Sequence, residues 1–576
     1  MARFLLVLAL AISALAQTQT PCENTPAYSP CEMTFELFGS VATAHPDPYA
    51  DVDLHIEFRS PHFKTYLMPA YWGGGNRMVV RFTPTEAGPW NYKITSNIAS
   101  LDGKEGTFNA ASSDSPGFVH PKNVHHWWTE NKQPHLWIGD VADRLAFAPP
   151  AEFDQKLADT IQNKFTHLRL SILGSDGDRS RIFTGKRPNT AYFDELDRRI
   201  VEINKKGIVA DLVLASDPAV ISSLAPDRDS RTQLIRYLVG RYAPMNITWQ
   251  GVMDWEDFPD GRALLKEIGL ALKNTDPYDH PRSTNAKITS SPLLGDGWMN
   301  FVIERSTQPG DDQMGSIEHQ LYPVPFVGIT TAQRIWNTTM DGEYPVFEGK
   351  GEAEAKHWHE LIEDSRHWEL EPYFDVDGGR AVALEGVEYL LYVDGPGPVE
   401  VDVEKHGYDV RWFDPRTGET VDAKKYKGEA FTADVPDKSH PWVLEVSREG
   451  RKESMLKSYY FESTPIIMQE VEQTVEKVPF KIVAPTGDNL PVSVPVPYSI
   501  KLTRQTRATR TMFYLWTGEV ATEGQGARVL GTGPDGTLRV PDMLAKTYPA
   551  VLSLRVTAIN ANGKAYSVDH VFQLTK

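Results

Sequence analysis

The chain has little cysteine, no long apolar run and no excess of positive charge, and each shortage excludes a class of protein. Cys22 and Cys31 are the only cysteines among 576 residues, so a disulfide-rich scaffold and a multi-cysteine zinc site are excluded. Lys and Arg number 59 against 77 Asp and Glu, a net charge of −18. An acidic chain repels phosphate backbones, so we expect no nucleic acid partner. No stretch reaches 18 apolar residues, and we expect no membrane span.

The sequence also lacks the short motifs of several hydrolase and nucleotide-binding classes. It has no Gly-x-Ser-x-Gly nucleophile elbow and no Walker loop, and His357-Trp358-His359-Glu360 does not have the His-Glu-x-x-His spacing. We therefore predict no metal ligands and no organic cofactor. A zinc hydrolase and a peptidase are both disfavoured.

The amino terminus has the pattern of an export signal. After one basic residue, segment 4–15 is apolar but too short to span a bilayer, and Ala14-Leu15-Ala16 is a small-x-small cleavage pattern. We expect residues 1–16 to be a signal peptide and the protein to be secreted or periplasmic. In such an oxidising compartment we expect Cys22 and Cys31 to close a small loop.

The rest of the chain divides into four segments by its pattern. Residues 17–118 contain short strands separated by Pro, Gly and Asp clusters, which is typical of a β-sandwich. In residues 119–370 apolar strands alternate with amphipathic helices, which predicts a (β/α)₈ TIM barrel. Residues 371–447 and 448–576 are again rich in strands, and we expect two further β-sandwiches, the last of them Ig-like. The predicted fold class is therefore multidomain, a central TIM barrel flanked by β-sandwich domains.

The barrel elements that stand out most clearly are six strands and four helices. The strands are expected at 136–139, 166–173, 208–214, 246–253, 299–303 and 344–347, and the helices at 151–164, 192–206, 231–242 and 261–274.

Two of these strands end in acidic residues. Active sites of TIM barrels lie at the carboxyl ends of the strands. Strand 246–253 is followed by Asp254, and strand 344–347 by Glu348, and we count them as the fourth and roughly the seventh strands. One carboxyl group would protonate a glycosidic oxygen and the other would attack the anomeric carbon. A separation of about 5–5.5 Å gives retention of configuration, and a wider one gives inversion.

Aromatic and polar residues near these strands are candidates for contacts with a sugar. Trp249 and Trp255 flank the first acid and could stack on a sugar ring. Arg169, on the second strand, could hydrogen-bond the nucleophile, although a salt bridge inside the barrel is an equal alternative. His319 and Tyr322 could bind sugar hydroxyl groups, although a lone loop histidine is more often structural.

A fourth candidate segment is His125-His126-Trp127-Trp128, which could line the rim of the cleft.

A family pattern runs through four barrel segments: Lys132 to Ala142 with its Gly139-Asp140 pair, Tyr192 to Asp197 followed by Lys206-Gly207-Ile208, Trp249 to Asp254, and Tyr344 to Glu348. These segments resemble the clan A glycoside hydrolases, most closely the apiosidase-like family. The resemblance implies that Asp254 is the acid/base and Glu348 the nucleophile. It also implies that Asp140 belongs to the substrate-binding region, and that no cofactor is needed.

The flanking domains fit the same resemblance. Residues 33–110 resemble the uncharacterised β-sandwich that often precedes such barrels, and residues 376–447 resemble a collagen-binding-type domain that often follows. Two positions depart from the family pattern. Met253 stands where clan A has an Asn. The family's nucleophile often lies one residue beyond Glu348, where this chain has Gly349, so Glu352 is the reserve candidate for the nucleophile.

We therefore predict a secreted glycoside hydrolase that acts on a plant or microbial poly- or oligosaccharide by a two-carboxylate, retaining mechanism. The alternative from another class is a non-catalytic carbohydrate- or matrix-binding protein on a degenerate barrel. Met253 is the sequence feature that favours this alternative, because it removes a side chain that contacts the sugar.

Overall fold

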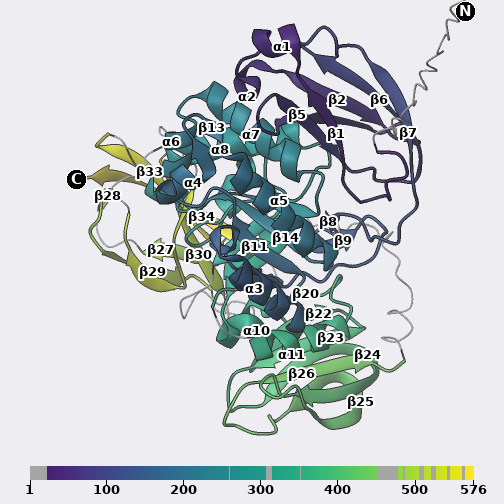
Figure 1. Cartoon of the computed structure of the whole chain (residues 1–576). Helices are drawn as coiled ribbons and strands as arrows, with labels where there is room; N and C mark the ends of the chain where they lie inside the picture. Colours follow the sequence, from purple (N-terminus) through teal and green to yellow (C-terminus); the bar gives the residue numbers. More distant parts are fainter. Residues whose placement is uncertain are drawn as a thin grey trace, which may run out of the picture. The chain divides into compact units, whose positions relative to one another are not determined.

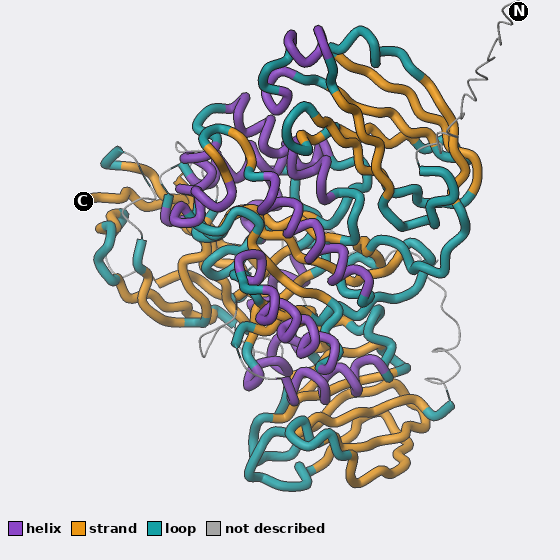
Figure 2. The backbone as a smooth tube through the Cα atoms, viewed as in Figure 1, coloured by secondary structure: helices purple, strands orange, loops and turns teal. Residues whose placement is uncertain are grey.

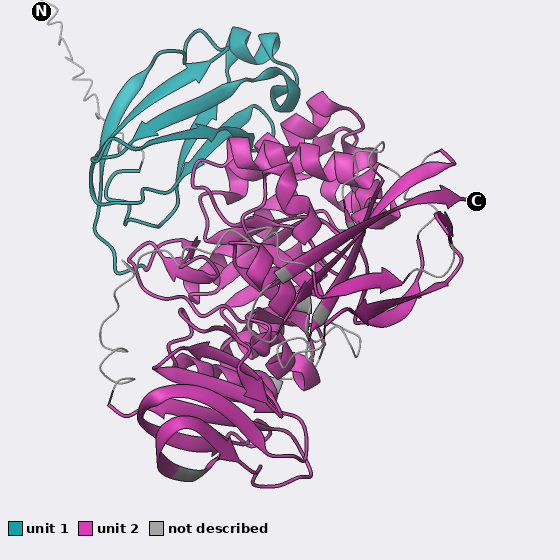
Figure 3. Cartoon of the chain, turned by 180° about the vertical axis from the view of Figure 1, so that it is seen from behind, with its two compact units in different colours: residues 1–115 teal, residues 116–576 magenta. Residues whose placement is uncertain are grey.

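The computed structural model describes residues 22–258, 260–305, 314–349, 352–450, 478–483, 487–504, 512–520, 527–540, 545, 547–560 and 565–576. The predicted signal peptide, residues 1–16, lies outside the described residues. The chain falls into two compact units, residues 1–115 and 116–576 (Figure 3). In the described part of the chain, no helix is long and apolar enough to cross a membrane.

Unit 1 is built from two antiparallel sheets, with strand orders β1-β5-β4 and β3-β2-β6-β7. Its elements are β1 (Cys31–Glu36), α1 (Gly39–Ala44), α2 (Pro48–Asp51), β2 (Leu54–Arg59), β3 (Thr65–Pro69), β4 (Tyr71–Trp72), β5 (Arg77–Phe82), β6 (Gly88–Ser96) and β7 (Glu105–Ala110). Burial alternates along β2, as expected for a strand with one face in a core. Phe58 of β2 stacks on Phe82 of β5 with ring centroids 3.8 Å apart, so the two sheets enclose an aromatic core.

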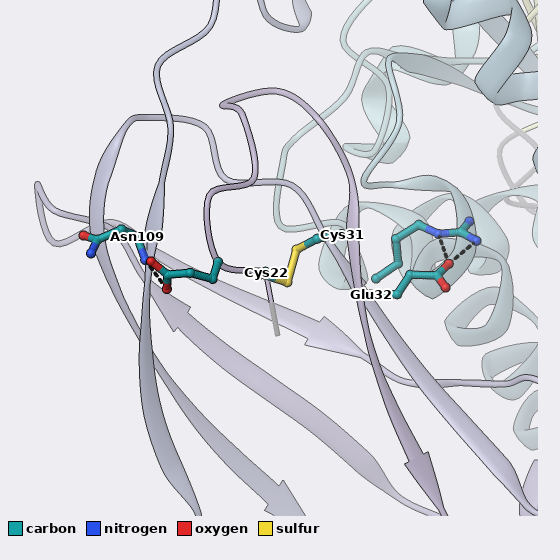
Figure 4. Close-up of a disulfide and its surroundings, with 6 residues drawn as sticks. Cys22, Cys31, Glu32 and Asn109 are labelled. Carbon is teal, nitrogen blue, oxygen red and sulfur yellow. Dashed lines mark hydrogen bonds and ion pairs between the residues drawn. A yellow bond between two sulfur atoms is a disulfide. The ribbon is translucent and has the colours of Figure 1, made fainter. Parts of the chain in front are cut away.

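The expected disulfide is present in unit 1. Cys22 and Cys31 are bonded, and the bond ties the start of the described chain to the first residue of β1 (Figure 4). Next to it, Glu23 accepts a hydrogen bond from the backbone N–H of Asn109, and Glu32 forms an ion pair with Arg81.

Unit 2 opens with the β8–β9 hairpin (Val119–Lys122 and His126–Thr129) and continues into eight parallel strands (Figure 1). The parallel strands are β10 (Gly139–Val141), β11 (His167–Ser171), β14 (Val209–Ala215), β15 (Ile247–Val252), β16 (Arg282–Ser283), β17 (Val302–Arg305), β18 (Phe326–Thr330) and β19 (Tyr344–Phe347). Their order, β16-β15-β14-β11-β10-β19-β18-β17, follows the chain around a near-closed TIM barrel. Asn300 bridges the remaining gap. Its backbone N–H donates to the carbonyl of Arg282, and its side-chain oxygen accepts from the Arg282 N–H.

Helices follow the barrel strands and cover their outer faces (Figure 2). They are α3 (Pro150–Gln162), α4 (Arg179–Ile182), α5 (Thr190–Lys205), α6 (Pro218–Leu224), α7 (Arg228–Tyr242), α8 (Gly261–Thr275), α9 (Met314–Leu321), α10 (Ile335–Met340) and α11 (Glu352–Glu363). Short 3₁₀ turns are η1 (Leu145–Phe147), η2 (Asp176–Asp178), η3 (Trp255–Asp257), η4 (Ser291–Asp296) and η5 (Ala332–Arg334), and β12 (Phe183–Thr184) pairs with β13 (Arg187–Pro188).

The sequence pattern of the helices is confirmed. In α5 the predicted apolar face, which includes Phe193, Leu196 and Ile200, is fully buried. Helix α7 begins earlier than expected, because Asp227 caps it by accepting a hydrogen bond from the backbone N–H of Ser230.

Two further β regions follow the barrel. The first is a seven-stranded sheet of β20 (Glu371–Tyr373), β21 (Val376–Asp377), β22 (Arg380–Leu384), β23 (Glu388–Val393), β24 (Val399–Phe413), β25 (Thr420–Ala433) and β26 (Trp442–Arg448). The second has two sheets, made from β27 (Phe480–Val483), β28 (Asn489–Pro491), β29 (Val496–Leu502), β30 (Phe513–Val520), β31 (Arg528–Thr532), β32 (Asp535–Leu538), β33 (Ala550–Ile559) and β34 (Ala565–Thr575). The multidomain fold class is therefore confirmed.

Candidate active site

The carboxyl ends of the eight parallel strands form one face of the barrel, and several charged side chains gather there. Asp254 comes two residues after β15, and Glu348 comes directly after β19. Because all eight strands run the same way, both acids stand at the same face, as the sequence predicted.

Asp254 has an unusual backbone conformation. Its φ is 51° and its ψ is 23°, in the left-handed region that non-glycine residues seldom adopt, although Asp tolerates it. The residue is exposed, and its carbonyl accepts a hydrogen bond from the N–H of Asp257 in the turn that begins η3. The turn thus directs the chain out of β15 and leaves the carboxylate open to solvent at the barrel mouth.

Glu348 is held by a cation from a neighbouring part of the mouth. Its Oε2 lies 2.5 Å from Nη1 of Arg305, the last residue of β17, and its side chain is 45% exposed. The backbone N–H of Glu348 also donates to the carbonyl of Thr330 at the end of β18. These two contacts fix the start of the loop and the orientation of the carboxylate.

The strand number assigned to Glu348 needs a correction. β19 is the eighth strand of the barrel and not roughly the seventh. The seventh strand is β18, which ends at Thr330, a residue without a carboxylate. Two strands escaped the sequence analysis: β16 is only Arg282-Ser283, and β18 is a five-residue segment with a glycine in the middle.

A third acid at the mouth was missed by the sequence analysis. Asp143, just beyond β10, forms a two-pronged ion pair with Arg169, with Oδ1 2.9 Å from Nε and Oδ2 3.0 Å from Nη2. Arg169 also donates to Asn285, which in turn donates to Gln250 of β15, at 2.7 and 2.8 Å. This network connects the ends of the first, second, fourth and fifth strands. Asp143 closes the Gly-Asp-Val-Ala-Asp run, and its place at a strand end is the signal that could have identified it.

The predicted interaction of Arg169 is therefore only half right. The side chain is buried in the barrel, as the salt-bridge alternative expected, and its partner is Asp143, whereas Glu348 is held by Arg305. Met253 lies beside it, with Sδ 3.6 Å from Nη2 of Arg169.

The two tryptophans have different positions. Trp255 lines a cavity of about 230 Å³ together with polar residues of the η3 and η4 loops and apolar residues near β31. The lining residues are Trp255, Glu256, Asp257, Lys287, Ile288, Thr289, Pro292, Leu293, Ala527, Val529 and Leu530. Trp249 is fully buried, and its Nε1 donates to Asp276 at 2.9 Å. It is a core residue, so its predicted role in sugar stacking is wrong.

Asp140 faces away from the mouth. It is buried against α3, with Oδ2 2.5 Å from Nζ of Lys156 and 3.3 Å from Oγ1 of Thr160. The alternation of side chains along β10 sends it to the helix layer, so its predicted place in the substrate-binding region is wrong.

His319 and Tyr322 lie at the opposite face of the barrel. Helix α9 runs back from the carboxyl end of β17, and the His319 ring reaches Phe326, the first residue of β18, at a centroid distance of 5.6 Å. The backbone carbonyl of Tyr322 accepts from His125 at the same face. His125 and His126 are also buried, and His126 contacts the hydroxyl of Tyr344 at the start of β19, so these residues lie away from the barrel mouth.

The side chain of the reserve candidate Glu352 lies outside the described part of the structure, and its backbone begins α11.

Fold and mouth together define a multidomain (β/α)₈-barrel protein with a carboxylate-rich active face. Residues 122–368 match the family model described as "Apiosidase-like, catalytic domain", and residues 24–97 match a domain of unknown function (DUF5060). The barrel is thus similar to the apiosidase-like catalytic domain, as the sequence analysis expected. No curated protein matches the chain.

Several solved structures share the fold. A candidate glycoside hydrolase from Bacteroides vulgatus ATCC 8482 is 17% identical, with a TM-score of 0.61, and the match covers 74% of this chain and 100% of that one. A second glycoside hydrolase is 15% identical with a TM-score of 0.51, over 60% of this chain and 98% of that one. A family 5 glycoside hydrolase from Bacteroides vulgatus ATCC 8482 is 14% identical with a TM-score of 0.50, over 60% of this chain and 95% of that one. The resemblance of residues 376–447 to a collagen-binding-type domain stays a prediction.

Proposed function

We propose that this protein is an exported glycoside hydrolase that cleaves a poly- or oligosaccharide at the barrel mouth. One observation carries the proposal: two exposed carboxylates, Asp254 and Glu348, stand at the carboxyl ends of β15 and β19 on the same face of the barrel. The match of residues 122–368 to the apiosidase-like catalytic domain supports the same reaction class.

In this mechanism Asp254 protonates the leaving oxygen and then activates water. Glu348 attacks the anomeric carbon, and the configuration is retained. The ion pair with Arg305 orients the Glu348 carboxylate, so that less freedom is lost when the covalent bond forms. The Asp143–Arg169–Asn285–Gln250 network supplies polar groups near the same mouth that can position sugar hydroxyl groups.

The experiment compares wild type with Asp254→Asn and Glu348→Gln on a polysaccharide panel and on activated aryl glycosides. Glu348→Gln should abolish turnover of every substrate. Asp254→Asn should slow natural substrates by about 10²–10⁴-fold, but it should largely spare the first step with an aryl leaving group that needs no proton. Azide should then rescue Asp254→Asn, and proton NMR of the first-formed product should show the starting anomer.

Asp143→Asn and Glu352→Gln test the two other acids that could act as the nucleophile. If Asp143→Asn abolishes turnover while Glu348→Gln does not, the nucleophile is on the first strand and our assignment is wrong. Inversion of the anomer in the NMR experiment would exclude the covalent route and leave Glu348 as a base.

One observation favours the second candidate function, a non-catalytic carbohydrate-binding protein. Met253 stands where the resemblance expects an Asn, and its sulfur lies 3.6 Å from Nη2 of Arg169, so the position offers no amide for a sugar hydroxyl group. Wild-type protein that binds glycans by calorimetry, releases no reducing ends across the panel and is unaffected by Glu348→Gln would decide for this alternative.

A further inference from the structure

A cluster of histidines and one glutamate lies at the amino-terminal face of the barrel, away from the carboxylate mouth. His125 directly precedes β9 and His126 begins it, His319 belongs to α9, and Glu371 begins β20. The His126 Nδ1 lies 2.8 Å from the hydroxyl of Tyr344, the first residue of β19, which fixes the cluster at the amino ends of the strands. The sequence analysis assigned His125, His126 and His319 to sugar contacts or the cleft rim, but they lie at the other face of the barrel, and the proposed hydrolysis does not use them.

Three nitrogen atoms converge on the Glu371 carboxylate. Its Oε2 lies 3.0 Å from His125 Nδ1 and 3.3 Å from His319 Nδ1, and its Oε1 lies 3.2 Å from His126 Nε2. One ligand atom each from His125, His319 and Glu371 can be chosen so that all three lie within 4.8 Å of one another. The two distances to Glu371 Oε2, 3.0 and 3.3 Å, are separations that ligands about 2.0–2.2 Å from one ion can have.

The hydrogen bonds of His125 fix which of its nitrogens is free to bind a cation. Its Nε2 lies 3.1 Å from the backbone carbonyl of Tyr322, and a carbonyl can only accept, so Nε2 carries the proton. In the neutral ring, Nδ1 then carries a lone pair, and this lone pair faces the Glu371 carboxylate. Two lone pairs facing each other repel, so either a second proton on the ring or a metal ion must stand between Nδ1 and the carboxylate. A ring N–H donated to a backbone carbonyl is also the usual outer support of a metal-binding histidine.

His319 provides a second, independent observation. It is fully buried, neither ring nitrogen makes a hydrogen bond, its Nδ1 contacts only the Glu371 carboxylate among the described ion pairs, at 3.3 Å, and its ring lies over that of His125 at a centroid distance of 3.6 Å. A buried polar group without a partner is costly, and a bound cation at Nδ1 would satisfy it.

We propose that His125, His319 and Glu371 form a binding site for one divalent transition-metal ion of the zinc class. The ligands are Nδ1 of each histidine and the Glu371 carboxylate, and His126 supports the carboxylate by donating from Nε2 to Oε1. Two imidazoles and one carboxylate suit zinc, whereas magnesium and calcium prefer ligand sets made of oxygen alone.

The site is structural in role because of where its ligands come from. The three ligands come from the hairpin before the barrel, a helix between the sixth and seventh strands, and the first strand after the barrel. An ion bound to all three would tie these segments together at the amino-terminal face, which in TIM barrels contributes to stability rather than to catalysis.

The test uses the full-length, untagged protein after chelator treatment and dialysis. We expect calorimetry with zinc chloride to give one site per chain, and the melting temperature to rise with zinc concentration while magnesium and calcium have no effect. Cobalt(II) in place of zinc should give the visible absorption of a low-symmetry nitrogen and oxygen site.

Two variants and one control keep the proposal open to refutation. Glu371→Gln and His319→Gln should reduce the bound zinc from one equivalent to near zero and abolish the melting-temperature shift, with a loss of affinity above the 10–100-fold typical of outer-shell changes. His120→Gln is the control, because His120 lies in the same hairpin and its Nε2 is 2.9 Å from the carboxylate of Glu130, outside the proposed ligand set; it should bind zinc as wild type does.

The proposal is overturned if wild-type protein binds no zinc and shows no melting-temperature shift, or if both ligand variants keep a full equivalent. If a variant does not fold, the cobalt spectrum and zinc titration of folded wild type still decide. A titration in which His120→Gln alone loses the metal would place the site elsewhere and would also refute it.

Discussion

Glu343 is a buried acid that keeps its proton in the folded protein, and this should make the protein less stable as the pH rises. It lies just before β19, is 3% exposed, and neighbours Glu304, which is fully buried. Gly328 and Gly315 leave room for its carboxyl group, because a Cβ at either position would overlap it. Burial, with a contribution from the nearby Asp341, raises the pKa of Glu343 from 4.5 to about 8.

The size and sign of the effect follow from these values. Between pH 4.5 and about 8 the folded protein keeps a proton on Glu343 that the unfolded chain has released, so the free energy of unfolding falls as the pH rises. Each pH unit in that window costs about 1.4 kcal/mol, or roughly 5 kcal/mol across the whole window. Glu343→Gln keeps the shape of the neutral acid and has no charge to release. It should therefore match wild type near pH 5 and exceed it by several kcal/mol at pH 8.

The assay is urea unfolding of both proteins, followed by tryptophan fluorescence at intervals from pH 5 to 8.5. Glu343 also raises the pKa of Glu304, so the difference between the two curves reports the buried Glu304–Glu343 pair, while the remaining titrating groups are shared. Asp178→Asn is the control. The hydrogen bond from Arg144 is the largest cause that lowers the Asp178 pKa to about 2, so its effect on the unfolding free energy should not vary with pH above 5. A Glu343→Gln curve that runs parallel to wild type, or lies below it at pH 8, would refute the reasoning.

Three further predictions concern other parts of the chain. Cys31→Ser opens a loop that spans a sequence separation of 9 and should lower the stability of unit 1 by about 2–3 kcal/mol, which thermal unfolding with and without reductant will measure. N-terminal sequencing of protein from an exporting host should find Gln17 first, and retention of Met1 in secreted protein would contradict the signal peptide. Gly269→Ala should destabilise unit 2 by about 1–3 kcal/mol in the same unfolding assay, because its Cβ would overlap the ring of Trp298.

The fold was largely predictable because periodicity records burial directly. In β14 every residue is buried, and its sequence is an apolar run interrupted only by Asp211. β16 could not be found in this way. Its two residues, Arg282 and Ser283, are both polar, and they are strand residues only because β15 pairs with them on one side and Asn300 bonds to them on the other. Such an element is defined by its neighbours, and the sequence pattern alone does not contain it.

The candidate site was predictable only in part. The strand-end rule located Asp254 and Glu348, because a residue that comes just after a barrel strand lies at the barrel mouth. The family resemblance failed for Asp140, which is inside its strand and takes the outward side of the alternation, while Asp143 follows the strand end. Missing β16 and β18 also left the strand count approximate, so Glu348 was assigned to roughly the seventh strand and not to the eighth.

The position of His319 along its helix indicates which face of the barrel this residue occupies. A helix after a barrel strand begins near the mouth and returns to the amino ends of the strands, rising about 1.5 Å per residue. Helix α9 has 8 residues, and His319 stands close to its end, so the return path has already carried it toward the opposite face. Histidine serves both sugar binding and metal binding, so its type is uninformative here. Its place along the connecting helix, together with complete burial and the carboxylate of Glu371 3.3 Å away, favours a metal ligand over a sugar contact.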